Sequence, residues 1–376
     1  MPFELGALRR HPDVEGRGLE ASDAADRLIL DEAAALSAGL GDGELVVLDD
    51  AYGALALGSA AAGARGIRVH QDLVTGERAL AANAARADLD GEVRSMPLGP
   101  ELLAGARLVL LRLPRSLDRL DELAGLIASH AASDVVVVAG GRLKHMSLSM
   151  NEVLAAWFER VDVSHARQKS RVLIARAPLP HRRPPALGWP RGERHDDLGV
   201  TLVAHGGVFA GTGVDIGTRF LLEHLGDAAP DAATAVDLAC GSGVVAAWLA
   251  RTRPALRVTA TDRSASAAAS ARQTAEVNGL ADRVDVRQAD GLEGISDASE
   301  RLVVLNPPFH SDAALHTGIA AHLFADAARV LVPGGELWCV WNSHLRYRPL
   351  LERVVGPTRQ VARNAKFTVT ASERTA

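Results

Sequence analysis

The chain carries one pattern of segments twice, and this repetition limits its fold more than any other feature. In the second half, the apolar run 235–238 leads into Gly241-Ser242-Gly243 and an alanine-rich helical stretch. In the first half, the apolar run 45–49 leads into Gly53 and another stretch of small residues. Each half alternates short apolar runs with amphipathic helical runs, which is typical of a parallel α/β sheet.

A second pair of matching segments supports the repeat. The apolar run that ends before Asn306 resembles the run that ends before Arg112, and each is followed 28 residues later by two glycines, Gly334-Gly335 and Gly140-Gly141. We therefore predict two tandem α/β domains with one ancestral fold. The alternative is a chance likeness between two unrelated α/β domains.

The predicted boundary between the domains is a proline-rich segment. A length of 376 residues suits two domains of ordinary size. Residues 179–190 hold several prolines, which forbid a continuous helix or a central strand. We place domains at 1–178 and 198–376 with a linker at 179–197. The arginines of the linker either touch RNA phosphates or are simply solvated.

Bulk properties exclude several classes of protein. The net charge of −5 excludes a polycation, so any contact with nucleic acid needs local basic patches. The sequence contains no run of about 18 apolar residues, which argues against a membrane span. The N-terminus shows no secretory signal. Cys240 and Cys339 lack CxxC spacing, and the scattered histidines lack zinc-like spacing. We expect a cytoplasmic protein without a metal.

The glycine turn predicts a nucleoside cofactor. Gly241, Ser242 and Gly243 sit between a buried strand containing Asp237 and a helix whose free N–H groups point at a ligand. Asp262, at the end of the next strand, can accept hydrogen bonds from both ribose hydroxyls. These features fit S-adenosylmethionine, but they also fit NAD or a turn without ligand.

A third carboxylate ends the next predicted strand, residues 283–288. Asp290 can accept a hydrogen bond from the adenine amino group of an adenosyl cofactor. It can equally be a helix cap or a turn residue.

The segment Asn306-Pro307-Pro308-Phe309 is the strongest chemical signal. It directly follows the fourth predicted strand of the second domain, and ligands of open parallel sheets lie beyond the carboxyl ends of the strands. The two prolines fix the backbone, so the Asn306 side chain is aimed. The Asn306 oxygen and the Pro307 carbonyl can each accept one N–H of a target amine, while Phe309 can stack on a planar base. The alternative is a strand that merely ends in a turn.

On these motifs, the chain resembles the tandem-domain bacterial ribosomal RNA guanine-N2 methyltransferases that act on small- or large-subunit rRNA. The further motifs of the resemblance are Gly207-Val208-Phe209-Ala210, Asp215-Ile216-Gly217, His310, Val340-Trp341-Asn342, Leu345-Arg346-Tyr347 and a closing strand Asn364-Ala365-Lys366-Phe367. A small residue is expected in the family at Trp341. Adenine-N6 and protein-glutamine methyltransferases share Asn-Pro-Pro-Phe and remain the alternative; Phe209 and His310 favour guanine N2.

The resemblance implies two class I, Rossmann-like methyltransferase domains, of which the N-terminal one is degenerate and helps to hold RNA. The residues agree, since Leu55 replaces the second glycine and Leu113-Pro114-Arg115 replaces Pro-Pro-Phe, while Asp72 lies near the ribose-acid position. We expect a monomer that binds S-adenosylmethionine and methylates guanine N2 in ribosomal RNA or in an assembled subunit.

Overall fold

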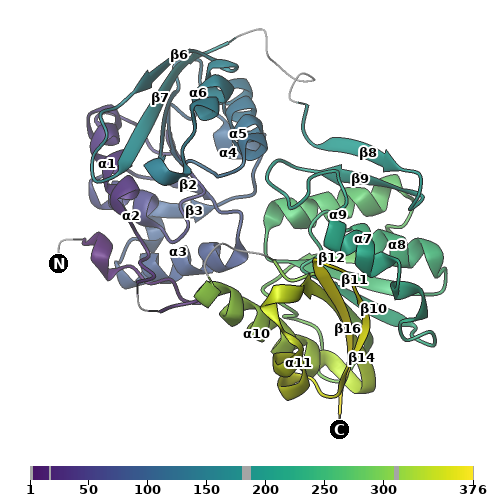
Figure 1. Ribbon diagram of the computed structural model, residues 1–376. Helices are drawn as coiled ribbons and strands as arrows, with labels where there is room; N and C mark the ends of the chain where they lie inside the picture. Colours follow the sequence, from purple (N-terminus) through teal and green to yellow (C-terminus); the bar gives the residue numbers. More distant parts are fainter. Residues whose placement is uncertain (1–2, 17, 180–187, 309–312, 376) are drawn as a thin grey trace. The chain divides into compact units, whose positions relative to one another are not determined.

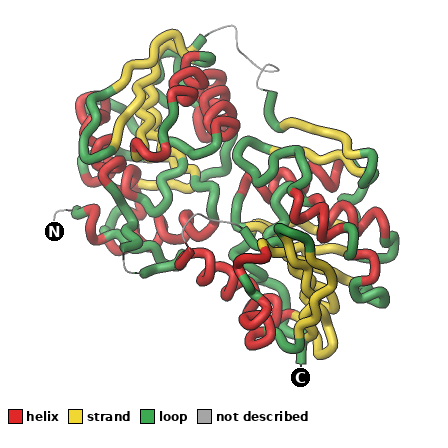
Figure 2. The backbone as a smooth tube through the Cα atoms, in the orientation of Figure 1, coloured by secondary structure: helices red, strands yellow, loops and turns green. Residues whose placement is uncertain are grey.

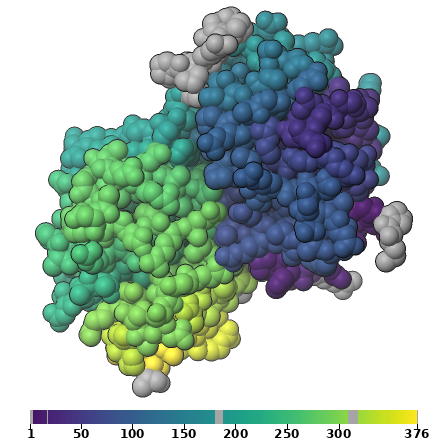
Figure 3. Space-filling view, turned by 180° about the vertical axis from the view of Figure 1, so that it is seen from behind, coloured from purple at the N-terminus to yellow at the C-terminus, as the bar shows by residue number. Residues whose placement is uncertain are grey.

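The computed structural model divides the chain into two compact units, Met1–Trp189 and Pro190–Ala376 (Figure 1). It describes residues 3–16, 18–179, 188–308 and 313–375, without the side chains of 313–317. Figure 3 shows the surface of the first unit in purple, blue and teal and that of the second in teal, green and yellow. Residues Arg191–His195, which we placed in the linker, form strand β8 of the second unit.

The first unit is built on a seven-stranded sheet in the order β3-β2-β1-β4-β5-β7-β6. Strands β6 and β7 join it antiparallel, whereas the others are parallel. Its strands are β1 Leu45–Leu48, β2 Ile67–His70, β3 Val93–Ser95, β4 Leu108–Arg112, β5 Val136–Arg142, β6 Phe158–Val163 and β7 Ser170–Pro178. Its helices are α1 Ala24–Ser37, α2 Ala54–Ala61, α3 Val74–Arg86, α4 Pro100–Leu103, α5 Leu117–His130 and α6 Leu148–Ala155.

The second unit begins with a two-stranded sheet, β8 and β9, and then repeats the large sheet in the order β12-β11-β10-β13-β14-β16-β15. Its strands are β8 Arg191–His195, β9 Val200–Ala204, β10 Thr234–Leu238, β11 Arg257–Asp262, β12 Val284–Gln288, β13 Glu300–Leu305, β14 Leu331–Asn342, β15 Thr358–Arg363 and β16 Phe367–Glu373. Its helices are α7 Ile216–Leu222, α8 Val244–Thr252, α9 Ala265–Val277, α10 Ala313–Val330 and α11 Arg348–Val354.

Apolar side chains on both faces of the central strands explain why helices cover both faces of the sheet. In β1 the side chains of Val46 and Leu48 pack against α4, α5 and α6, while Leu45 and Val47 pack against α1, α2 and α3. Alternate residues of a strand point to opposite faces, so a continuous apolar run needs cover on both. In the second unit, α8 and α9 lie to one side of the sheet and α10 and α11 to the other (Figures 1 and 2).

The two large sheets have the same topology, which confirms the predicted pair of Rossmann-like domains. Strands β1 and β10 hold the same position in their sheets, so the pairing of each with its neighbouring strands shows which residues of the two units correspond. Leu48 pairs with Leu111 of β4 and Leu238 pairs with Leu305 of β13. The next residue is Arg112 in one unit and Asn306 in the other, so the predicted match between these two positions is confirmed.

Two other predicted matches are wrong. Gly53 and Gly243 each have a left-handed backbone and directly precede a helix, so these two glycines correspond. The residue two positions earlier is Ala51 in the first unit and Gly241 in the second, so Ala51, and not Gly53, stands at the place of Gly241. Leu55 therefore does not replace the second glycine. The equal spacing to the Gly-Gly pairs is a coincidence: Gly140 lies inside β5 opposite Arg112, whereas the pair in β14 lies at a register shift near the start of that strand.

The predicted closing strand begins later than expected. Asn364 and Lys366 lie in the turn between β15 and β16, where the Asn364 Oδ1 accepts hydrogen bonds from the backbone N–H groups of Lys366 (2.9 Å) and Phe367 (2.7 Å). The strand itself starts at Phe367. Among the described residues, no helix is long and apolar enough to cross a membrane.

Candidate active site

The glycine turn between β10 and α8 serves two separate purposes. Both Gly241 (φ +55°) and Gly243 (φ +79°) have left-handed backbone, which glycine adopts at the lowest cost. A Cβ on Gly243 would lie 2.8 Å from the Cβ of Ala271 on α9, so this glycine allows α8 and α9 to pack closely. A Cβ on Gly241 would meet nothing within 4 Å. Gly241 therefore leaves room for a ligand to approach the backbone.

Asp237 lies in β10 before the turn and Ser242 lies within the turn, and both are buried. The Asp237 Oδ2 accepts a hydrogen bond from the Ala246 backbone N–H at 2.9 Å, which ties the strand to the first turn of α8. Burial raises the pKa of Asp237 to about 7, against the lowering effect of that N–H. Asp237 thus shapes the turn from below, and its carboxylate is occupied by the protein itself.

Asp262 ends β11 beside the same turn. Its Oδ2 accepts a hydrogen bond from the Gly241 N–H at 3.0 Å, and its Oδ1 accepts one from the Ser264 N–H at 2.9 Å. Ser264 caps α9, so the carboxylate is held between the glycine turn and a helix start. Strands β10 and β11 are parallel neighbours, so this acid lies at the carboxyl edge of the sheet, where we predicted a ribose contact.

Asp290 follows β12 at the same edge. The residues after it form a turn and not a helix, so it is no helix cap. Its Oδ1 lies 3.9 Å from the His322 Nε2. Asp326 of α10, which we missed from the sequence, accepts a hydrogen bond from the Leu292 N–H at 2.8 Å and approaches Gly291 so closely that a Cβ there would lie 2.2 Å from its Oδ2. Asp326 thereby fixes the turn that carries Asp290.

Asn306 directly follows β13, and only the nitrogen of its side-chain amide has hydrogen-bond partners among the described residues. Its Nδ2 donates to the Thr218 Oγ1 at 2.9 Å and to the Asp215 Oδ2 at 3.3 Å. Its Oδ1 is buried, and no atom of the described residues donates a hydrogen bond to it. A buried acceptor without a partner costs about 1–3 kcal/mol and calls for an explanation such as a ligand. Pro307 and Pro308 follow; Phe309 and His310 lie outside the described residues.

The motif Asp215-Ile216-Gly217 supplies the support for Asn306. Asp215 caps α7, because its Oδ2 also accepts hydrogen bonds from the backbone N–H groups of Gly217 (2.9 Å) and Thr218 (3.1 Å). A Cβ on Gly217 would lie 2.9 Å from the ring of Phe367 on β16, so only glycine lets α7 lie this close to the sheet. The cap and the glycine together place Thr218 under the Asn306 amide.

Two apolar side chains in the segment between β9 and α7 and at the start of α7 are exposed. Phe209 is 57% exposed and Ile216 is 64% exposed, whereas Val208, which directly precedes Phe209, is buried with Ala204 and Ala267. The predicted motif around Phe209 thus anchors one side chain and presents another to solvent. Such side chains offer a surface to an apolar or aromatic ligand.

The corresponding corner of the first unit has different chemistry. Arg112 forms ion pairs with Asp23 (2.9 Å) and Asp26 (2.8 Å), and Asp23 caps α1 as Asp215 caps α7. The register between β1 and β2 places Gln71, and not Asp72, where the second unit has Asp262.

Other predictions concern the rim and the core. Trp341, where we expected a small residue, is buried; its ring lies 5.9 Å from that of Tyr347. The His205 Nε2 lies 3.4 Å from the Gln273 Nε2. Within the described part of the chain, no three His, Cys, Asp or Glu side chains are grouped as for a metal ion.

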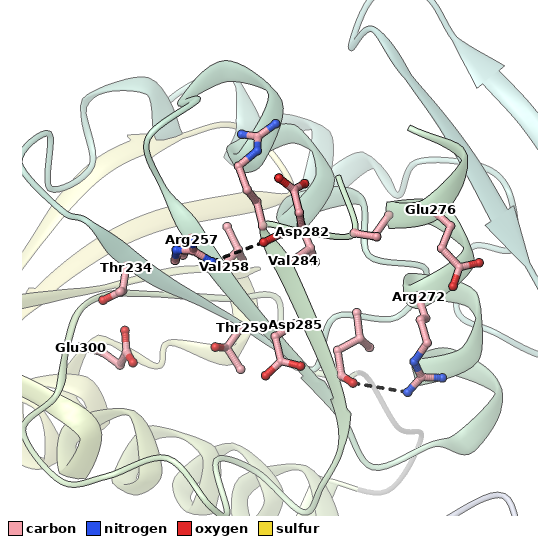
Figure 4. Close-up of a pocket in the computed structure, with 14 residues that line it drawn as sticks. Thr234, Arg257, Val258, Thr259, Arg272, Glu276, Asp282, Val284, Asp285 and Glu300 are labelled. Carbon is pink, nitrogen blue, oxygen red and sulfur yellow. Dashed lines mark hydrogen bonds between the residues drawn. The ribbon is translucent and has the colours of Figure 1, made fainter. Parts of the chain in front are cut away.

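A pocket in the second unit lies elsewhere (Figure 4). Thr234, Arg257, Val284 and Glu300, which line it, stand at the first residues of β10, β11, β12 and β13. These are the amino ends of the parallel strands, so the pocket is at the opposite edge from Asp262 and Asn306. It is not the site described above.

Comparisons with known proteins identify the family of each unit. The family model described as "Methyltransferase small domain" matches residues 199–371, which include every predicted site residue, and the "RLMG N-terminal domain" matches residues 2–179. The second unit is therefore a methyltransferase domain.

Relatives cover the whole chain. Proteins named ribosomal RNA large subunit methyltransferase G from Streptomyces coelicolor and Pseudomonas aeruginosa are 36% and 35% identical, over 98% of this chain and 98% and 97% of their own lengths. The chain belongs to the ribosomal RNA large subunit methyltransferase G family. In fold it is similar to the 16S rRNA N2 methyltransferase RsmC of T. thermophilus, solved with AdoMet and guanosine, with a TM-score of 0.73 and 21% identity over 96% of this chain and 97% of that one.

Proposed function

We propose that this protein transfers a methyl group from S-adenosylmethionine to the exocyclic N2 amine of a guanine in large-subunit ribosomal RNA. One observation carries the proposal: the Asn306 Oδ1 is a buried acceptor with no partner among the described residues. It lies at the carboxyl end of β13, next to β10 and its glycine turn. The names of the relatives favour the large subunit over the small one.

The cofactor is assigned to the turn between β10 and α8 and to the acids beside it. The open side of Gly241 and the N-terminus of α8 suit the methionine end, Asp262 suits the ribose, and Asp290 suits the adenine. Ser242, Gly243 and Asp237 hold the shape of the turn from within. When bound, S-adenosylmethionine supplies an electrophilic methyl group.

The residues of the chain supply the orientation. The Asn306 Oδ1 and the Pro307 carbonyl each accept one hydrogen of the amine, which directs the nitrogen lone pair away from both. An amine conjugated with a purine ring is a poor nucleophile, and these hydrogen bonds favour the tetrahedral nitrogen of the transition state. An amide oxygen accepts the hydrogen bond without taking the proton, so Asn306 is not a general base. Phe309 stays a predicted stacking partner.

The RNA surface is proposed from the same observations. Phe209, and Ile216 directly after Asp215, have exposed side chains that offer apolar contact to an extruded base or ribose. We also propose that the first unit holds RNA, and that the protein works as a cytoplasmic monomer, because one chain carries every group of the site.

The identity of the methylated base tests the proposal. Large-subunit rRNA from cells that lack the protein, offered naked and as assembled subunit, is incubated with the protein and labelled S-adenosylmethionine, then digested to nucleosides. We expect N2-methylguanosine from at least one of the two substrates. N6-methyladenosine, or label that enters a protein glutamine and no nucleoside, would refute the guanine assignment.

A further inference from the structure

We propose that Asp215 and Thr218 are positioning residues that decide which end of the Asn306 amide faces the target amine. This inference rests on the proposed function, because it concerns how the acceptor of that reaction is presented. It adds two residues of α7 to a site otherwise built from the ends of the strands.

An asparagine amide needs such a device because its two ends have nearly the same shape. Rotation by half a turn exchanges the oxygen acceptor for two N–H donors. With the wrong end forward, Asn306 would present N–H groups to an amine that itself donates, and the amine would lose one of its acceptors. Fold and packing alone do not distinguish the two orientations.

Asp215 makes the distinction. A carboxylate only accepts hydrogen bonds, and the Asp215 Oδ2 already accepts from the backbone N–H groups of Gly217 and Thr218. It also accepts from the Asn306 Nδ2 at 3.3 Å. In the reversed orientation the Asn306 oxygen would face this carboxylate oxygen, and two acceptors would meet. The cap of α7 therefore turns the Asn306 oxygen away from itself.

Thr218 adds a second contact at 2.9 Å. A hydroxyl can donate or accept, so Thr218 strengthens the orientation that Asp215 sets without choosing it. The Thr218 side chain is buried, with only 5% of the residue exposed, so water does not compete freely for the Asn306 Nδ2.

The first unit offers an independent comparison. Asp23 caps α1 as Asp215 caps α7, and Asp26 stands three residues after its cap as Thr218 does. There both positions are carboxylates, and both pair with the Arg112 guanidinium. In the second unit a neutral hydroxyl replaces the second carboxylate and a neutral amide replaces the guanidinium. This matched exchange leaves one acceptor, the Asn306 Oδ1, without a partner among the described residues.

The substitution Asp215→Asn separates positioning from support. Asparagine is as good a helix cap as aspartate, so α7 should stay folded. Its side-chain oxygen is neutral, so while it caps α7 it holds the Asn306 Nδ2 less strongly than the carboxylate does and disfavours the reversed orientation less. We expect the single-turnover rate of methyl transfer to fall on the order of 10- to 100-fold. The melting temperature and the affinity for S-adenosylhomocysteine should stay close to those of the unchanged protein.

Thr218→Val and Thr218→Ser form the matched pair. Valine keeps the shape of threonine but removes the oxygen, so the rate should fall; serine keeps the oxygen, so most of the rate should return. If Asp215→Asn and Thr218→Val both retain the full rate, the positioning role is overturned. It is also overturned if the rate falls only together with the melting temperature and the cofactor affinity, because that pattern marks a structural cap.

A double substitution gives the sharpest result. Asn306→Asp has two equivalent oxygens and needs no orienting, but it places a carboxylate beside Asp215. Adding Asp215→Asn removes one of the two facing negative charges, so the double variant should be faster than Asn306→Asp alone. A double variant that is slower than both single variants would overturn the inference. Failure of the unchanged protein to form N2-methylguanosine would instead refute the proposed function.

Discussion

The ends of β13 and β4 hold the same place in two sheets of one topology, yet they carry different chemistry. Asn306 donates its amide hydrogens to Asp215 and Thr218, and its oxygen has no partner among the described residues. The Arg112 side chain can only donate hydrogen bonds, and it forms ion pairs with Asp23 and Asp26 of the first unit. A position in the fold does not make an active site. A free acceptor whose neighbours fix its direction does.

The turns after β10 and β1 also share their backbone shape but differ at the residue that is Gly241 in the second unit. The glycine needed for close packing is present in both units, since a Cβ on Gly53 would lie 2.8 Å from Leu80, as one on Gly243 would from Ala271. The glycine with an open side, Gly241, has Ala51 as its counterpart. The first unit has thus kept the residue that the fold requires and lacks the one that a ligand requires.

The largest expected effect is on catalysis. Asn306→Ala removes the proposed acceptor, and we expect the rate of methyl transfer to fall on the order of 10²- to 10³-fold. Affinity for S-adenosylhomocysteine should stay within a few-fold, as measured by calorimetry. Arg112→Ala is the matched control in the first unit and should leave the transfer rate of the folded protein unchanged. Equal loss of rate and cofactor affinity in Asn306→Ala would make Asn306 a structural residue.

The next effect is on cofactor binding. Asp262→Ala removes the proposed ribose contact, and because hydrogen bonds to charged groups contribute about 1.5–3 kcal/mol, affinity for S-adenosylhomocysteine should fall about 10- to 100-fold. Calorimetry should also show one bound cofactor per chain. Gln71→Asp in the first unit should not create a second site, since Ala51 and Arg112 remain. A stoichiometry of two in the unchanged protein would contradict the difference between the units.

A smaller effect concerns stability. Arg112→Ala leaves Asp26, which is 4% exposed, without its cation. The free energy of unfolding of the first unit should fall by about 2 kcal/mol. This lies between the values for breaking a buried ion pair and an exposed one, because Arg112 and Asp23 are partly exposed. Urea unfolding monitored for the first unit measures it. Asn306→Ala should cost the second unit less, and the opposite ranking would mean that Arg112 does not hold α1.

The smallest effect is on the pH dependence of stability. Burial raises the pKa of Asp237 to about 7, from an ordinary value near 3.8. Folding favours the protonated form of Asp237. Its contribution to the free energy of unfolding is therefore complete below pH 4 and is lost as the pH rises through 7. Between pH 6 and 8 the loss should be about 1 kcal/mol. Unfolding of Asp237→Asn should lack this slope.

Asp50 gives the matching measurement in the first unit. It accepts hydrogen bonds from the N–H groups of Leu55 and Ala56, and burial raises its pKa to about 8. The corresponding slope should therefore lie about one pH unit higher than that of Asp237. A flat profile in both units between pH 6 and 9 would contradict these assignments.

The sequence predicted the fold because the fold depends on local patterns, and the proposed site rests on motifs that are equally local. Apolar runs, the glycine turn and Asn306-Pro307-Pro308 each appear within a few residues, and the strand registers place Asn306 and Arg112 as predicted. The match of glycine pairs failed for a physical reason. Gly140 is required because a Cβ would lie 2.4 Å from Ile29 of α1, whereas Gly334 takes a positive φ in β14.

The support of Asn306 could not be read from the sequence. Asp215 and Thr218 lie 91 and 88 residues away from it, and only packing brings α7 under β13. In the sequence, Asp215 followed by Gly217 indicates the start of a helix, but it does not indicate which residues that helix start contacts. The turn after β1 misled in a similar way, because Ala51 adopts the left-handed backbone that usually marks glycine.

One measurement tests the central claim most directly: a crystal structure of the protein with S-adenosylhomocysteine and guanosine. We expect the cofactor against Gly241 and Asp262, and the guanine N2 at hydrogen-bond distance from the Asn306 Oδ1, with the Nδ2 still on Asp215 and Thr218. A cofactor absent from this crevice, or an Asn306 amide turned so that its oxygen faces α7, would contradict the account.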